Sequence, residues 1–537
     1  MFRKSLNFIV VVLLILVNII CLSNEAYTQP SNIKNDMFWN TQDGWPIYSQ
    51  GGGIFKFNDP STGESRYYWY GVHYKEAELY RENPSVTYPN CSFESVTCYS
   101  STDLVHWTFE GDVLTKEELK KVDGDKRKWI GRMGVAYIQE ANRYAMFIQH
   151  DKGVLVAVSS KPTGAFTWHQ KINMEPYIGT PNTGDQTVFT DEETGKSYLV
   201  YCYGVGRNKI YISELGMKSG LIGLLDCTQV YKGSGREGNC MFKYKGKYYL
   251  CASNLYGWDA SLAYYLVADN IKGPYIPKND MCVMPGCERD YAHVTQTGFF
   301  YTYKLGTQET VIYCGDRWAD FAGNGLGYNQ WVPISFQDDV PLFNSISSWN
   351  FDAMSGRWEV ASDNNYVMNA SFEADRKLIP SNFKPVQQQL LGWSTTVIEG
   401  NSISKDSSSI ILNYDNSQSD RKIVVGEKSL LITDKSNFKR KISQVIESTP
   451  YVPLKDGLYT LSASVKNGAG FSKLEMYAVS NGKKNNKDFF QEHDTWTVIT
   501  MKNVLVKDGM VEIGFYAEGD ANATCYIDDV SLILELE

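Results

Sequence analysis

Two acidic residues stand at matching points of the sequence, each directly before a run of strand-forming residues. Asp185 opens the run DQTVF, and Glu237 opens the run EGNCMF. One carboxyl group can protonate a leaving oxygen while a second shifts its pKa or helps to activate water. Cleavage of a glycosidic bond requires such a pair around one bond. The two acids therefore predict acid–base chemistry on a glycoside if the fold brings them together; otherwise both are solvated residues of turns.

The elements around these acids are short aromatic strands that recur along the chain. Most follow a polar or glycine-containing turn. A hairpin unit that recurs at roughly 50 to 75 residues, with almost no helical periodicity, is typical of a β-propeller. Five units predict five blades within residues 36–345. The strand signals lie at residues 67–71, 143–147, 198–201, 248–250 and 310–313.

A propeller places the start of each inner strand around one central funnel. We therefore expect catalytic residues to come one from each blade. Asp185 belongs to the third predicted blade and Glu237 to the fourth. The two acids are accordingly predicted to converge on a shared pocket.

The sequence pattern changes after the fifth unit. A segment containing serine and asparagine follows, and we place a linker over residues 346–366 with the domain boundary near Asp363. Apolar and polar residues then alternate, for example over residues 457–463 and 511–516. Such alternation is typical of strands with one buried face. The prediction is an all-β chain, with a five-bladed β-propeller followed by a jelly-roll β-sandwich over residues 367–537.

Composition supports two globular domains and limits the classes of partner. Of the 537 residues, 43% are hydrophobic and 21% are charged, as in globular proteins. Aromatic residues make up 14%, and aromatic faces suit both β-strands and the apolar faces of sugar rings. The net charge of −9 with no block of Lys or Arg argues against nucleic-acid binding. The six histidines show no metal-ligand spacing, so no cofactor is predicted to be required.

The N-terminus has the pattern of an export signal. Arg3 and Lys4 precede an apolar stretch over residues 8–22, which predicts a signal peptide over residues 1–26. The expected location is periplasmic or extracellular, with no transmembrane domain after processing, and Cys21 raises the alternative of a lipid anchor. Beyond the signal, Cys91 with Cys98 and Cys282 with Cys287 are either short disulfides or buried thiols.

The order and context of the two acids resemble those of glycoside hydrolase family 43 over residues 45–340. Asp185 precedes a strand that ends in D-x-x-x-G-K-x-Y-L, and Glu237 precedes Y-x-G-K-Y-Y-L. The resemblance implies a five-bladed enzyme of inverting mechanism, in which Asp185 tunes the pKa and Glu237 is the general acid. Phrases around Trp258, at 315–318 and at 331–333 resemble the exo-β-1,3-galactanase branch of this family.

The resemblance also implies roles for further residues. The galactanase branch lacks the first-blade Asp of the wider family, and a fifth-blade Gln is thought to handle the water instead. Gln296 matches that position, while residues 49–53 here read SQGGG. For Trp258 and Trp331 the alternative is a buried core position, and for Asp316 and Arg317 the alternative is an ion pair with each other. We assign substrate binding to Trp258, Asp316, Arg317, Trp331, Gln50 and Arg132.

One position departs from the galactanase branch. The galactanases carry a Glu in the second blade, and the corresponding residue here is Gly131. One interpretation is that another carboxylate, such as Glu94, reaches into the space that this Glu would occupy. A change of substrate and a loss of catalysis are the other interpretations, and the last would make the propeller a glycan-binding protein.

The predicted function is that of an exo-acting inverting glycosidase on a plant-type polysaccharide or oligosaccharide. The first substrate is β-linked galactose of an arabinogalactan-type chain, and the alternatives within the family are α-L-arabinofuranose and β-xylose. The sandwich resembles carbohydrate-binding modules, in which residues corresponding to Glu373 and Asp528 often lie near a structural calcium. Trp393 and Tyr451 are predicted to be either glycan-binding or core residues.

Overall fold

The structure is a computed structural model. It describes residues 31–536, apart from 61, 84–87, 89, 125–129, 320–323, 375–389, 402–409 and 413–427. The predicted signal peptide and Cys21 lie outside the described residues. Among the helices that are described, none is long and apolar enough to cross a membrane.

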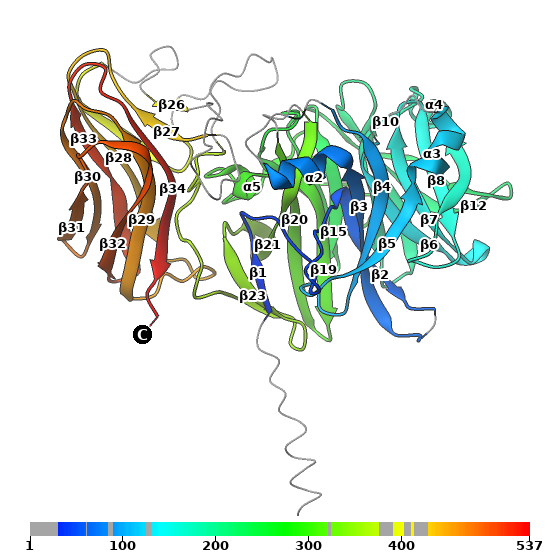
Figure 1. The fold of residues 1–537 in the computed structure, drawn as a ribbon. Coiled ribbons are helices and arrows are strands. Elements are labelled where there is room, and N and C mark those ends of the chain that lie inside the picture. The colour runs from blue at the N-terminus through cyan, green and yellow to red at the C-terminus, as the bar shows by residue number, and fades with distance from the viewer. Residues whose placement is uncertain are drawn as a thin grey trace, which may run out of the picture.

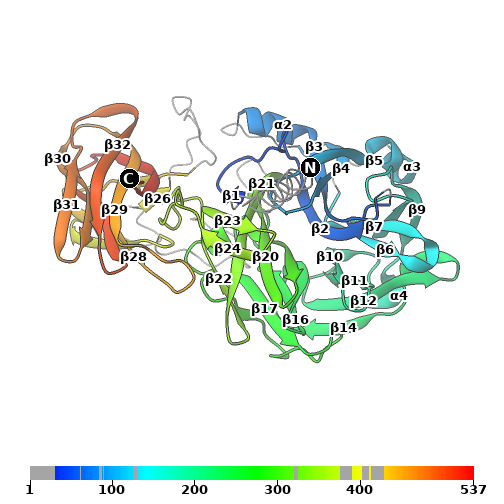
Figure 2. The ribbon, with the colours of Figure 1, turned by 90° about the horizontal axis from the view of Figure 1, so that it is seen from below.

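Five antiparallel sheets form the blades of a propeller (Figures 1 and 2). The first strand of each sheet packs beside the first strands of the two neighbouring sheets, so that the ring closes from the fifth blade to the first. The predicted five-bladed propeller is therefore confirmed. The strands, blade by blade, are β2 (Gln50–Asn58), β3 (Ser65–Tyr74), β4 (Phe93–Ser101) and β5 (Thr108–Thr115); β6 (Met133–Ile138), β7 (Arg143–His150), β8 (Gly153–Ser159) and β9 (Thr167–Ile172); β10 (Thr183–Asp191), β11 (Lys196–Tyr203), β12 (Lys209–Lys218), β13 (Leu221–Leu224) and β14 (Thr228–Lys232); β15 (Glu237–Tyr244), β16 (Lys247–Ser253), β17 (Ala263–Ala268) and β18 (Cys282–Val283); β19 (Gln296–Leu305), β20 (Gln308–Ala319), β21 (Asn324–Gln337) and β22 (Val340–Phe343).

The aromatic runs of the sequence form the second strand of each blade. Strand β3 is buried on both faces from Tyr67 to Val72, because neighbouring blades cover both sides of each sheet. A strand buried on both faces reads as a continuous apolar run rather than as an alternation. Short helices occupy the connections: α2 (Lys75–Glu82), α3 (Lys116–Asp123), α4 (Glu175–Ile178), α5 (Tyr291–Val294) and the 3-10 turn η2 (Gln139–Ala141).

A small three-stranded sheet joins the N-terminal segment to the chain beyond the last blade. Strand β1 (Ser31–Lys34) pairs with β23 (Ser348–Asp352), which pairs with β24 (Arg357–Val360). Part of the segment predicted as a linker is therefore regular β-structure. Sequence periodicity alone does not show this pairing, because the partner strand lies at the other end of the domain.

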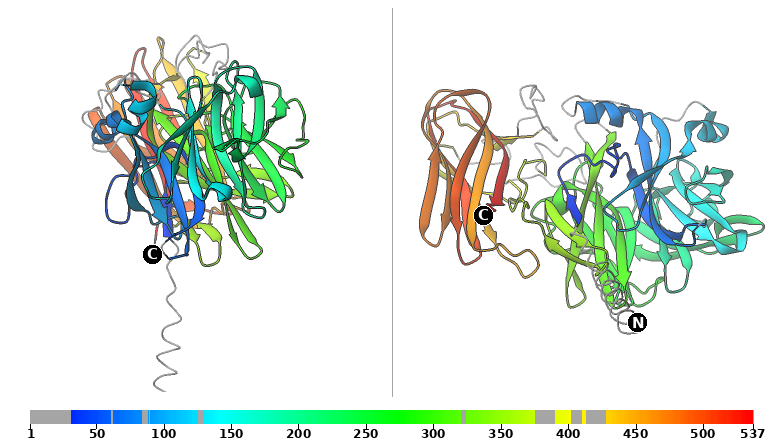
Figure 3. Two further views of the ribbon diagram at one scale, coloured as in Figure 1. Left: turned by 90° about the vertical axis from the view of Figure 1, so that its right-hand side faces the viewer. Right: turned by 60° about the horizontal axis from the view of Figure 1, so that its bottom comes forward.

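The C-terminal domain is a β-sandwich of two five-stranded sheets beside the propeller (Figure 3). Apolar side chains from both sheets form its core, and Trp393 is one of them, with 4% of its surface exposed. One sheet contains β25 (Ser394–Glu399), β28 (Phe438–Glu447), β33 (Met510–Gly519), β30 (Phe471–Ser480) and β31 (Lys483–Asp488), and the other contains β26 (Ile410–Leu412), β27 (Leu430–Ile432), β34 (Cys525–Leu534), β29 (Gly457–Asn467) and β32 (His493–Val506).

Candidate active site

A cavity of about 250 Å³ lies where the inner strands of the propeller begin. At least one polar side chain from each blade lines it. Gln50 begins β2, Arg132 directly precedes β6, Asp185 lies near the start of β10, Glu237 begins β15, and Gln296 begins β19. The structure thus brings together five of the residues predicted from the sequence, each from the start of an inner strand.

Bulges at the strand starts aim these side chains toward the axis. The register of the inner strand shifts directly after Gln50 and Glu237, and similar shifts lie beside Asp185 and Gln296. A β-bulge re-aims a side chain and often lies beside a functional site. Gly238, which follows Glu237, has a φ of 60°, a conformation that glycine adopts at little cost.

The glycine run after Gln50 allows the first inner strand to approach its neighbour closely. A Cβ atom on Gly52 would lie 1.7 Å from the carbonyl oxygen of Tyr70, so a larger residue is excluded there. The first inner strand therefore approaches its neighbour more closely than a strand of larger residues could.

Arg207 holds the two carboxylates together. Its Nη1 atom donates a short hydrogen bond to Oε2 of Glu237 and lies 3.8 Å from Oδ1 of Asp185. The backbone N–H of Gly238 donates to Oδ2 of Asp185 at 2.8 Å. Asp185 thus contacts the element that carries Glu237, and the predicted convergence of the two acids is present in the structure.

The surroundings push the pKa values of the two acids apart. Burial and the negative charge of Asp185 raise the pKa of Glu237 to about 7, although Arg207 and Arg132 oppose the shift. Burial also acts to raise the pKa of Asp185, but Arg207, Arg132 and the N–H of Gly238 outweigh it, so that this pKa is lowered. Two acids with separated pKa values are a recurring arrangement in enzymes that transfer protons. At neutral pH the pair can therefore hold one proton, on Glu237.

Gln296 connects the general acid to the rest of the site. Its Nε2 atom donates to Oε1 of Glu237 at 2.9 Å. Its Oε1 atom accepts from Nη2 of Arg132 at 3.0 Å and from Nε1 of Trp318 at 2.8 Å. These two donors fix the orientation of the amide, with its nitrogen directed at Glu237.

Arg132 is a connecting residue as well as part of the pocket wall. Its guanidinium donates to Asp185 at 3.3 Å and to Oδ2 of Asp316 at 2.6 Å, and it lies over the ring of Trp318. Asp316 is 4% exposed and also accepts from the N–H of Gly51. Asp316 therefore pairs with Arg132 rather than with Arg317, and it supports the site from behind the lining.

Like Asp316, two further residues assigned to substrate binding do not reach the pocket. Trp331 is 1% exposed, with its ring centroid 4.8 Å from that of Trp69, because it fills an aromatic cluster between blades. Arg317 points away from the cavity and forms an ion pair of 3.2 Å with Glu373 in the C-terminal domain. These two assignments and that of Asp316 are therefore corrected.

Trp258 does line the pocket. It is half-buried and packs edge to face against Trp318, with ring centroids 5.1 Å apart. Aromatic residues that keep an accessible face in a pocket suit the apolar faces of sugar rings.

Two residues of the pocket escaped the sequence analysis. Arg207 lies in a glycine-containing loop between β11 and β12, and Gly184 leaves room for its side chain. Gln149 comes from the end of β7 and lines the wall beside Gly131. Glu94, suggested for that space, instead pairs with Lys116 at 2.8 Å. The glycines around Arg207 are the one local signal, whereas the place of Gln149 depends on strand pairing.

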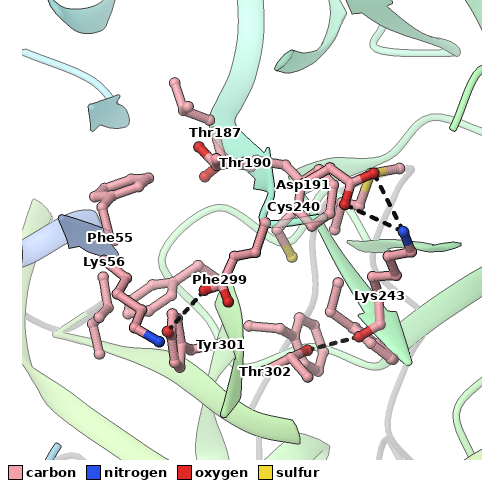
Figure 4. A pocket seen from close by; sticks show the side chains of 18 of the residues that line it. Phe55, Lys56, Thr187, Thr190, Asp191, Cys240, Lys243, Phe299, Tyr301 and Thr302 are labelled. Atoms are coloured by element: carbon pink, nitrogen blue, oxygen red, sulfur yellow. Dashed lines mark hydrogen bonds and ion pairs between the residues drawn. The ribbon is translucent and has the colours of Figure 1, made fainter. Parts of the chain in front are cut away.

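A second, smaller cavity of about 80 Å³ lies deeper between the inner strands (Figure 4). Two of its carboxylates have protein partners: Asp191 contacts Lys243 at 3.2 Å, and Glu192 accepts from Tyr301 at 3.2 Å. The larger cavity, with its acid pair and half-buried tryptophan, is therefore the candidate active site.

The residues proposed for calcium binding already have protein partners. Glu373 accepts from the N–H of Lys428 at 2.7 Å as well as from Arg317. Asp528 is 1% exposed and accepts from the N–H of Asp529. Within the described ranges, no group of three or more His, Cys, Asp or Glu side chains is arranged to hold a metal ion. The calcium site stays a prediction.

The cysteine alternatives are decided in favour of thiols. Cys98 and Cys287 are buried thiols and Cys282 is an exposed one, so neither short disulfide is formed. Tyr451 is half-buried rather than part of the core. Its hydroxyl donates to the carbonyl oxygen of Phe336 in the propeller at 2.8 Å.

Comparisons with known proteins agree with the fold. Residues 63–303 match the family model described as glycosyl hydrolases family 43. The exo-β-1,3-galactanase of Phanerochaete chrysosporium, solved with galactose, is 20% identical, with 93% of this chain and 100% of that chain covered and a TM-score of 0.52. The exo-β-1,3-galactanase of Clostridium thermocellum is 18% identical, with 94% and 100% covered and a TM-score of 0.53. These two likenesses support the fold. No curated protein sequence matches the chain.

Proposed function

Because residues 63–303 belong to glycosyl hydrolases family 43, we propose that this glycoside hydrolase releases terminal β-linked galactose from an arabinogalactan-type polysaccharide. The observation that carries the proposal is the acid pair. Glu237 has a pKa raised to about 7 beside an ionised Asp185, which is the state that a general acid needs near neutral pH. The galactanases of similar fold support galactose as the sugar.

The proposed reaction is a single displacement with inversion at the anomeric carbon. Glu237 protonates the glycosidic oxygen as the bond to the anomeric carbon breaks, and water attacks from the opposite face. The attacking water loses its proton to solvent, and Glu237 takes up a proton from solvent before the next turnover. Asp185 stays ionised beside Arg207 and keeps the proton on Glu237 until it is transferred. Gln296 contacts Glu237 directly at 2.9 Å, so the glycosidic oxygen must take the place of its amide before Gln296 can position the water.

The remaining residues of the site have supporting roles in this proposal. Trp258 stacks on the sugar ring, and Gln50 hydrogen-bonds a hydroxyl group. Arg132 holds Asp185, Asp316 and Gln296 in place through three hydrogen bonds. Export to the periplasm or beyond, as the N-terminal sequence predicts, would place the enzyme where polysaccharides occur.

The test is the release of free sugar from arabinogalactan and β-1,3-galactan by the purified protein and by Glu237→Gln. We expect galactose from the parent, in the inverted anomeric form by NMR, and a loss of at least about 100-fold in the variant, because one general acid contributes that much. The matched control is Glu140→Gln, an exposed acid of the same propeller, which should keep full activity.

Other products would change the proposal in defined ways. Release of arabinose from arabinan or of xylose from xylan, without galactose, would assign one of the alternative sugars to the same acid pair. If parent and variant bind the polysaccharide equally and release nothing, the propeller is a glycan-binding protein and the proposed function is wrong.

A further inference from the structure

The pocket wall at Gly131 is filled by a residue from the next strand. A Cβ atom built on Gly131 would lie 2.5 Å from Oε1 and 2.7 Å from Cδ of Gln149. Any larger residue at position 131 would therefore displace this amide. The backbone fixes the arrangement, because the N–H of Gly131 donates to the carbonyl of Gln149 and the N–H of Gln149 donates to the carbonyl of Arg132.

The side chain of Gln149 is held so that its nitrogen faces the acids. It is 7% exposed, and its Oε1 atom accepts from the N–H of Arg132 at 3.1 Å. Its Nε2 atom lies 3.5 Å from Oδ1 of Asp185, at the limit of a hydrogen bond. An amide nitrogen carries two hydrogens. Even with one directed at Asp185, the second can serve a ligand in the cavity.

Gln50 provides a hydrogen-bond acceptor in the same cavity, which complements the donor of Gln149. It is 4% exposed, and its Oε1 atom is buried with no hydrogen-bond partner among the described residues. A buried polar atom without a partner costs free energy, and in a pocket a ligand can remove that cost. The two glutamines belong to the first and second blades and line the same cavity as Glu237.

We propose that Gln50 and Gln149 together bind one hydroxyl group of the terminal sugar and so determine which sugar the pocket accepts. The hydroxyl would donate to Oε1 of Gln50 and accept from Nε2 of Gln149, which matches the two capacities of an alcohol. Both groups are uncharged, so this wall selects a neutral hydroxyl. The inference deepens the proposed function, because it names the contact that distinguishes the sugar.

The neutral amide at position 149 also adds no negative charge beside Asp185 and Glu237, so that it does not change their protonation. A carboxylate in its place would lie within about 4 Å of Asp185, where like charges disfavour ionisation. Gln149→Glu should therefore move the alkaline limb of activity to higher pH, because the added negative charge raises the pKa of Glu237.

The experiment compares hydrolysis of an aryl β-galactoside and of its monodeoxy derivatives by the parent and by Gln149→Leu. For the parent, removal of the contacted hydroxyl should lower kcat/KM by about 10- to 100-fold, since a buried partner is left unpaired. For Gln149→Leu the same removal should cost less than about threefold, because the hydrogen bond from Gln149 is already lost. Gln139→Leu, an exposed glutamine of the same propeller, is the matched control.

The proposal would be overturned if each deoxy sugar lowered kcat/KM equally in the parent and in Gln149→Leu, with both proteins folded by circular dichroism. If the parent hydrolyses no aryl galactoside and releases no galactose from arabinogalactan, the proposed function fails on its own. The glutamine pair is then tested by NMR titration of galactose, arabinose and xylose into parent and Gln149→Leu. Weaker binding of one sugar to the variant supports the pair, and unchanged binding of all three, or no binding to the parent, overturns it.

Discussion

At the scale of single residues, the surroundings of each carboxyl group determine which of the two acids is protonated and which is ionised. Glu237 is buried beside a negative charge, and both effects favour its protonated form. Asp185 accepts hydrogen bonds from Arg132 and from the N–H of Gly238, with Arg207 nearby, and these favour its ionised form. The sequence places similar acids in similar turns, and only the neighbours make one of them a proton donor.

The first prediction at this scale concerns the pH profile. Because Glu237 must carry its proton to act as the acid, kcat/KM should fall as the pH rises through about 7. Asp185→Asn removes the negative charge that raises this pKa, so the alkaline limb should move to lower pH, and activity at neutral pH should fall with it. The measurement is kcat/KM on an aryl glycoside from about pH 4 to about pH 9.

Glu140→Gln is the control for that profile, and it should leave the limb in place. An alkaline limb that stays at the same pH in Asp185→Asn would contradict the assignment, since the group that titrates would not sense Asp185.

Much of the site could be predicted from residue types and their spacing. Asp185, Glu237 and Gln296 all begin inner strands, and the propeller brings such positions together whatever the rest of the blade contains. Trp331 and Arg317 were assigned wrongly because strands buried on both faces give no polar side to show which residues face the pocket. Gln149 was missed because it fills the space beside Gly131 through strand pairing, which the linear sequence does not record.

At the scale of elements, the segment before Gln296 adopts a left-handed turn. Tyr291, Ala292, His293 and Val294 have φ values of 52°, 56°, 57° and 59°. Left-handed conformation costs about 1–2 kcal/mol for each residue with a side chain, and runs of such residues are rare. Thr295 donates its N–H back to the carbonyl of Tyr291, so the turn ends directly before Gln296. The turn therefore fixes where the fifth inner strand begins.

Polar contacts of His293 hold this turn. Its N–H donates to Asp290 at 3.0 Å, and Gln330 donates to its carbonyl at 2.6 Å. Its ring lies between Asp36 at 3.1 Å and Ser345 at 2.8 Å. Burial acts to lower the pKa of His293, but the negative charges of Asp36 and Asp290 outweigh it, so the pKa is raised.

The second prediction is that His293→Gln weakens the turn in a pH-dependent way. A raised pKa in the folded state means that the charged ring adds stability, fully present below about pH 6.5 and lost as the pH rises through the folded-state pKa. The variant should therefore lose about 1–2 kcal/mol of unfolding free energy at pH 6, and less at high pH. Its kcat should fall, because Gln296 is displaced.

Denaturant unfolding at several pH values, together with kcat and KM, provides the measurement. His106→Gln is the control, because His106 is an exposed histidine that pairs with Asp103 far from the pocket. A loss of stability that is equal at all pH values would show that the ring acts by packing alone.

At the scale of the whole molecule, the sandwich contacts the strand that supports the active site. Arg317 lies between Asp316, which holds Arg132, and Trp318, which lines the pocket. Its side chain reaches across to Glu373, and both residues are at least nine-tenths buried. The sequence indicated two domains from the change of pattern near residue 345, but it could not show this pair, because the partners belong to different domains and no periodicity relates them.

The last prediction follows from the burial of that pair. Glu373→Gln keeps the size of the side chain and can still accept from the N–H of Lys428, but it removes the negative charge opposite Arg317. Loss of one partner of a buried ion pair costs about 3–5 kcal/mol, because the remaining charge stays buried without that partner. The melting temperature should fall, and so should kcat on an aryl glycoside too small to reach the sandwich.

Replacing both partners, in Arg317→Leu with Glu373→Leu, should lower the melting temperature less than Glu373→Gln does. The control is Glu399→Gln, at an exposed acid paired with Lys439, which should change neither the melting temperature nor kcat. If Glu373→Gln has the melting temperature and kcat of the parent, the sandwich does not support the active site through this contact.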